Sequence, residues 1–167
     1  MSDIRQLTED DESDYFELIE TIEGQLDNEL FWLPISATSR DHFFDDEWTT
    51  VLGLYENEKL VAASSLFYNS NEYGESASII GLGPSAGKIA EIGRCMVLPA
   101  HRGDDYMLLL NRKLLDMAKK RHVDTLIATA HPDNKGSCRS LEKLGMKKEG
   151  FAIKNGSYPR NIYAMSL

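Results

Sequence analysis

The chain has 167 residues, of which 42% are hydrophobic and 27% charged, and this composition predicts a single globular domain over residues 1–167. A formal net charge of -9 argues against nucleic acid as a partner, because proteins that bind it carry a basic face. The sequence contains neither an apolar run of membrane-spanning length nor a signal-peptide core, and its two cysteines have no zinc-ligand spacing, so we expect a cytoplasmic protein with no membrane or metal partner.

The first third of the chain predicts a strand followed by a helix. Residues 4–7 form the expected strand, and Thr8 with Asp11 has the spacing of a capping box at a helix start. The apolar face of the helix that follows consists of residues at helical spacing, namely Tyr15, Leu18, Ile19 and Ile22. A short second helix is expected at residues 39–44.

The middle of the chain predicts a strand hairpin and then a long connection. Residues 51–55 and 60–68 are strand-like, and the four residues between them favour a hairpin turn. Residues 69–87 are rich in Gly, Ser and Asn, so we expect a connection there, with a short strand at residues 78–80.

The second half alternates between strand and helix patterns. The expected strands are residues 89–98, 123–130, 147–153 and 160–166, and the expected helices are residues 106–121 and 137–144. Gly145 favours a left-handed end to the second of these helices. Taken together, the elements predict the α/β class, with a mixed sheet flanked by helices.

Acidic side chains are concentrated near the N-terminus. No Lys or Arg interrupts the series Glu9, Asp10, Asp11, Glu12, Asp14, Glu17, Glu20, Glu23, Asp27 and Glu29. Two interpretations remain open: a solvated helix face, or a field that attracts a cationic substrate such as an amine.

The most informative segment runs from Val97 to Gly103, between a predicted strand and a predicted helix. A helix N-terminus there would aim backbone N–H groups at a phosphate. Further along the chain, a second set of residues has a recognisable spacing, namely Asn134, Ser137, Lys143 and Gly145. The two segments resemble motifs A and B of the GNAT acyltransferase family, and the resemblance extends from about Ile89 to Phe151.

This resemblance implies the GNAT fold, a mixed and mostly antiparallel sheet with a splayed strand pair at the cofactor cleft, and acetyl-CoA or CoA as the bound acyl carrier. It implies that the cofactor contacts Met96, Val97, Arg102, Gly103, Asp104, Asp105, Tyr106, Met107, Asn134 and Ser137. The chain departs from the family pattern where Asp105 and Met107 replace glycines of the pyrophosphate loop. A carboxylate beside a diphosphate would be repulsive, by about 1 kcal/mol in water.

The implied reaction transfers an acetyl group to a primary amine, either a small amine or a peptide N-terminus. The acidic N-terminal side chains would favour a cationic acceptor. The resemblance makes Glu91 the candidate base. In many relatives a tyrosine on the motif B helix acts as the general acid, and this chain has Leu141 at the matching position. Tyr158, in the C-terminal hairpin, is therefore the candidate general acid. Monomers and homodimers both occur in the family.

Two other functions stay open. The residues that depart from the pattern, Asp105, Met107 and Leu141, suit a binding or regulatory module without catalysis. The pair Glu91 and Arg94, followed by Arg102 and Gly103 without the later glycines, also resembles the acyl-homoserine-lactone and N-acyl-amino-acid synthase relatives of this fold. This resemblance implies an N-acyltransferase that takes longer acyl chains from acyl-CoA or an acyl carrier protein.

Overall fold

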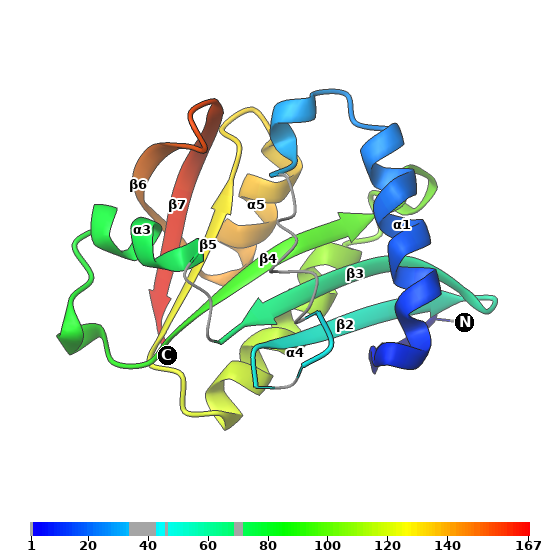
Figure 1. Ribbon diagram of the computed structural model, residues 1–167, viewed down its shortest axis with the longest axis horizontal. Coiled ribbons are helices and arrows are strands. Elements are labelled where there is room, and N and C mark those ends of the chain that lie inside the picture. Colours follow the sequence, from blue (N-terminus) through cyan, green and yellow to red (C-terminus); the bar gives the residue numbers. More distant parts are fainter. Residues whose placement is uncertain (1, 34–42, 46, 69–71) are drawn as a thin grey trace.

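Seven strands form one sheet in the computed structural model, which describes residues 2–33, 43–45, 47–68 and 72–167 (Figure 1). The order across the sheet is β1-β2-β3-β4-β5-β7-β6. The bounds are β1 (Ser2–Gln6), β2 (Thr49–Glu56), β3 (Lys59–Phe67), β4 (Ile89–Val97), β5 (Thr125–Ala130), β6 (Lys147–Lys154) and β7 (Tyr158–Ser166). Strands β4 and β5 run parallel, and the other neighbouring pairs are antiparallel. The predicted mixed, mostly antiparallel sheet is therefore confirmed.

Helices cover both faces of this sheet (Figure 1). Helices α1 (Glu12–Gly24) and α3 (Glu72–Ile79) lie on one face, and α4 (Tyr106–Lys120) and α5 (Lys135–Leu144) lie on the other. The predicted apolar face of α1 is buried, which fixes this helix against β3 and β4. Leu110 and Leu114 of α4 have no exposed surface, since they pack into the core beneath β2, β3 and β4.

The connection predicted over residues 69–87 is wrong in one respect, because residues 78–80 form no strand. The chain instead forms α3, followed by a 3-10 turn at Pro84–Ala86. The segment lacks a clear apolar stripe, so its helix depends on packing against β6 rather than on local propensity. Within it, Ser76 and Ala77 are buried.

Other predicted bounds differ by a few residues. Helix α5 begins at Lys135, two residues before the prediction, because Asn134 is its N-cap. Gly145 adopts a φ of 110°, so the predicted left-handed helix end is confirmed. The expected helix at residues 39–44 lies mostly outside the described residues.

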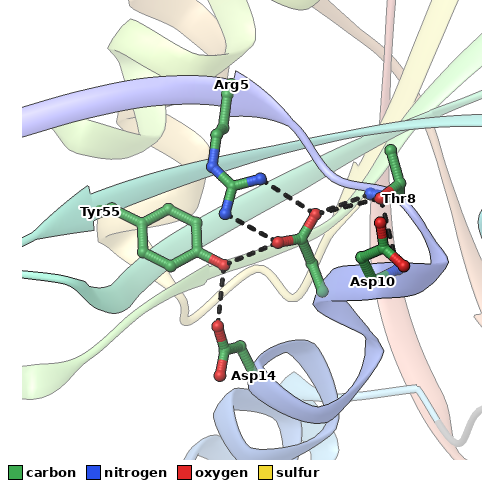
Figure 2. A network of polar contacts seen from close by, with 6 residues as sticks. Arg5, Thr8, Asp10, Asp14 and Tyr55 are labelled. Carbon is green, nitrogen blue, oxygen red and sulfur yellow. Dashed lines mark hydrogen bonds and ion pairs between the residues drawn. The ribbon is translucent and has the colours of Figure 1, made fainter.

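The start of α1 is fastened to the sheet by a buried carboxylate (Figure 2). Asp11 accepts hydrogen bonds from the Thr8 N–H at 2.9 Å and from Arg5 at 2.7 and 3.1 Å. The predicted capping box is present. The Tyr55 hydroxyl, on β2, donates to Asp11 at 3.3 Å and to Asp14 at 3.0 Å. Helix α1 is thereby held in place from its first turn, and its far end reaches the cavity described below.

The parallel pair β4 and β5 separates before either strand ends. Their ladder covers Ile89 to Ile92 of β4 and Thr125 to Ala128 of β5. Strand β4 continues to Val97 beside β3, with a bulge opposite residues 63–65. Arg94 has a φ of 50°, the left-handed conformation that such a bulge uses. Beyond Ile92, β4 has no described ladder partner on the β5 side, so the expected splayed strand pair is confirmed.

Candidate functional site

A cavity of about 700 Å³ opens where β4 and β5 separate. Its lining comes from the end of α1, the bulged half of β4, the N-termini of α4 and α5, the end of β5 and the start of β7. Most of the predicted site residues lie along it, namely Glu91, Met96, Val97, Arg102, Gly103, Asp105, Tyr106, Met107, Asn134 and Ser137. Asp104 and Tyr158 are not among the lining residues. Tyr158 begins β7 at the tip of the C-terminal hairpin, opposite Lys154.

The loop before α4 leaves its backbone uncovered. Gly103 has a φ of 97°, and no atom lies within 4 Å of the position that a Cβ would occupy there. Asp105 is the N-cap residue in a left-handed conformation, yet its side chain makes no capping hydrogen bond. The unpaired N–H groups of the first turn of α4 are therefore not capped by this carboxylate, and they remain available to an anion.

Cationic side chains surround this loop. Lys143 lies 3.7 Å from the Asp105 carboxylate, to which it contributes a solvent-exposed ion pair. Arg102 donates through Nε to the carbonyl of Val97 at 3.3 Å, which ties the loop to the end of β4. Lys135 and Arg139, both on α5, line the same cavity. The region is more favourable to an anion than the chain's overall charge suggests.

The hydroxyl of Tyr106, a tyrosine that lines the cavity, already donates its proton in a hydrogen bond to a neighbouring side chain. The Tyr106 hydroxyl donates a hydrogen bond to Glu56, and this bond raises the pKa of Tyr106 to about 12. His101 contacts the other oxygen of the same carboxylate through Nδ1 at 3.0 Å. Glu56, on β2, thus holds Tyr106 in the first turn of α4 and His101 in the loop before it. Because its pKa is raised, Tyr106 is a poor general acid.

The end of β5 and the start of α5 form the opposite wall. Asn134 caps α5 by accepting the Ser137 N–H at 3.3 Å. The imidazole of His131 accepts the Asp133 N–H through Nδ1 at 3.0 Å, and its ring centroid lies 4.9 Å from that of Phe31. Because Nδ1 is an acceptor, a neutral His131 ring carries its proton on Nε2.

Glu91 lies at the base of the splay, where it pairs in register with Phe67 of β3 and Ile127 of β5. It is buried, with 9% of its surface exposed. Arg94 lies in the bulge of β4, three residues after Glu91. Its guanidinium carbon lies 4.4 Å from the Phe43 ring centroid and 4.8 Å from that of Phe67. Glu91 and Arg94 therefore both line the cavity, next to the aromatic side chain of Phe67.

Arg160, a buried arginine of the cavity, was not identified from the sequence as a candidate site residue. Arg160 lines the cavity from β7, although it lies 69 positions after Glu91 in the printed chain. Nothing in its local pattern marks it, because the order of strands in the sheet brings it there. Within the described ranges, no three His, Cys, Asp or Glu side chains gather into a metal-binding group. None of the described helices combines the length and apolar character that a bilayer crossing requires.

Comparison with known proteins identified one matching family model and several solved structures with a similar fold. A family model described as the acetyltransferase (GNAT) family matches residues 4–146. FeeM, an N-acyl amino acid synthase from uncultured soil microbes, is similar with a TM-score of 0.74 and 18% identity, over 99% of this chain and 92% of that one. The putative acetyltransferase yncA from Salmonella typhimurium, solved with acetyl-CoA, has a TM-score of 0.72 and 17% identity over 100% and 94% of the two chains.

A ribosomal-protein-S5-alanine acetyltransferase from Vibrio fischeri is also similar, with a TM-score of 0.73 and 14% identity over 99% of this chain and 92% of that one. Identities this low show a shared fold. A search of curated proteins found no match.

Proposed function

We propose, on the premise that this chain belongs to the acetyltransferase (GNAT) family, that it transfers an acetyl group from acetyl-CoA to a primary amine. The acceptor is a small amine or a peptide N-terminus. One observation carries the proposal: a single cavity joins the open edge of β4, the uncapped N-terminus of α4 and the buried carboxylate of Glu91.

The cavity suits the acyl donor at two places. The β4 edge from Gly93 to Val97 offers backbone groups to the amide-containing pantetheine arm, as an added strand would use them. The first turn of α4 offers N–H groups to the diphosphate, and Lys143 and Arg102 supply positive charge nearby. Both interactions use backbone amides and cations, which this chain has although Asp105 and Met107 replace two glycines of the family pattern.

The acceptor amine must be neutral when it attacks the thioester carbonyl. In the proposed step, the amine nitrogen forms a bond to the acetyl carbon, its surplus proton passes to Glu91 directly or through one water, and the carbon–sulfur bond breaks. CoA leaves as a thiolate that takes up one proton. We assign the donor for this sulfur to the N–H of His131, which lines the cavity. The alternative donor is the candidate acid Tyr158, whose ring centroid lies 5.8 Å from the guanidinium carbon of Arg160.

The substitution Glu91→Gln tests this proposal, because it keeps the shape of the side chain and removes the base. We expect kcat to fall by about 100-fold or more, while the Kd for acetyl-CoA changes little. Glu149→Gln is the matched control, because Glu149 is an exposed glutamate on β6. Acetylation would be followed by release of CoA thiol, and acetyl-CoA binding by calorimetry.

Three outcomes would count against the proposal. Equal turnover of Glu91→Gln across the pH range would remove Glu91 as the base. An absence of binding heat at millimolar acetyl-CoA would favour a module without catalysis. A product formed only from longer acyl donors, seen by mass spectrometry, would replace the acetyl group in the proposal.

A further inference from the structure

Arg160 is a buried cation without a described counter-charge. Only 2% of its surface is exposed, and no carboxylate of the described residues lies within ion-pair distance of it. Burial lowers the pKa of Arg160 to about 10, so the guanidinium is still charged at neutral pH. Two carbonyls and the Tyr158 ring, whose centroid lies 5.8 Å from the guanidinium carbon, are its described contacts, and neither neutralises the charge. A buried charge without a counter-ion is costly, and it suggests that an anion from outside the chain completes the environment.

The hydrogen bonds of Arg160 leave one edge of the guanidinium unused. Nη1 donates to the carbonyl of Leu30 at 2.8 Å and to that of Pro159 at 2.7 Å. Among the described residues, no hydrogen bond uses Nε or Nη2. These two nitrogens form one of the planar edges on which a carboxylate binds with two parallel N–H···O bonds. Arg160 also lines the cavity, so a ligand there can reach this side chain.

The register of the sheet turns Arg160 to the same face as the proposed base. Glu91 pairs with Ile127 across the β4–β5 ladder, and Thr129 pairs with Ile162 across the β5–β7 ladder. Cross-strand partners, and residues two apart on one strand, share a face of the sheet. Glu91, Thr129 and Arg160 therefore share one face of the sheet, and all three line the cavity.

We propose that the acceptor is an amino carboxylate, a small molecule that carries a carboxylate in addition to its amine, and that Arg160 binds this carboxylate while Glu91 faces the amine. The inference rests on the proposed acetyl transfer and specifies its substrate class. A zwitterionic acceptor also fits the surrounding charges, because its ammonium end is attracted by the acidic chain and its carboxylate end by the buried guanidinium.

A purely structural role for Arg160 makes a different prediction. Its bond to Leu30 holds the 3-10 turn Glu29–Phe31 against β7, and loss of that bond would loosen the cavity wall for every acceptor alike. Carboxylate binding, in contrast, affects only acceptors that carry the carboxylate. The comparison of each acid with its neutral amide separates the two roles.

The test uses leucine, 4-aminobutanoate and 6-aminohexanoate, each beside its primary amide, with acetyl-CoA as donor. For at least one pair we expect kcat/KM to be about 10-fold or more higher for the acid than for the amide. Arg160→Gln should lower the value for that acid by about 10- to 100-fold and leave the amide within about threefold. Arg160→Lys should retain part of the preference, and Arg112→Gln, at an exposed arginine of α4, should retain all of it.

Several results would overturn the inference. It fails if the wild-type protein uses amides as well as acids in every pair, if Arg160→Gln lowers both members of a pair equally, or if a C-terminally amidated peptide is a better acceptor than every acid. Should Arg160→Gln not fold, the acid-to-amide ratios of the wild type and Arg160→Lys decide the matter.

Calorimetry with acetyl-CoA, and with each acid in the presence of CoA, distinguishes failure of the proposed acceptor class from failure of the proposed acetyl transfer. Binding of acetyl-CoA with no preference for acids refutes the acceptor class alone. An absence of acetyl-CoA binding refutes the proposed transfer, and preferential binding of acids would then still support the role of Arg160.

Discussion

The substitution Asp105→Asn tests whether the loop before α4 meets the diphosphate of CoA. Asp105 is the N-cap of α4 in a left-handed conformation, with a φ of 57°. Asparagine tolerates this backbone as well as aspartate does, so the change removes the charge and leaves the loop geometry intact. We expect CoA to bind more tightly to the variant.

The magnitude follows from the exposure of the carboxylate. The Asp105 side chain is 70% exposed, so its repulsion of a phosphate about 4 Å away is close to the value in water, about 1 kcal/mol. The change also frees Lys143, whose exposed ion pair with Asp105 contributes about 0–1 kcal/mol, to interact with the phosphates. A net gain of about 1 kcal/mol corresponds to a Kd for CoA that is about fivefold lower.

Calorimetric titration at low and high salt provides the measurement. The gain should shrink as salt rises, and pantetheine, which lacks the diphosphate, should bind both proteins equally. Asp116→Asn is the matched control, since Asp116 is an exposed residue of α4 about 16 Å along the helix from its N-terminus. An unchanged Kd for CoA in Asp105→Asn, or an equal gain for pantetheine, would show that the diphosphate lies elsewhere.

Two further predictions concern stability. Burial alone would raise the pKa of Asp11, but the Thr8 N–H and the Arg5 guanidinium outweigh burial and hold this pKa below its usual range. The ionised carboxylate therefore stabilises the fold fully above the unfolded pKa of about 4, and this contribution is lost as pH falls through the lower folded pKa. Asp11→Asn should cost about 1–3 kcal/mol at pH 7 and much less near pH 2 in urea unfolding; an equal cost at both values would contradict this. Leu114→Ala should cost about 2–5 kcal/mol, because Leu114 has no exposed surface, whereas a cost below about 1 kcal/mol would indicate that the core of α4 repacks.

Local patterns predicted the regular elements well where one segment carries its own signal. Asn134 and Gly145 bound α5 through a cap and a left-handed end, which are interactions within a few residues. The helix α3 was missed, because packing against β6 rather than its own sequence stabilises it. Met107 is only partly buried and lines the cavity, while its neighbour Leu108 faces the core, and local spacing alone did not separate the two.

The sequence by itself determined the fold class, the family resemblance and the order of the elements along the chain, because periodicity, caps and short motifs depend on neighbours in sequence. Only the tertiary structure decided which of these segments meet. The parting of β4 and β5 opens the cavity, and the strand order β5-β7-β6 carries Arg160 to it. Strand pairing joins residues far apart in the chain, and the pairing partner of a strand is not encoded in the strand's own residues.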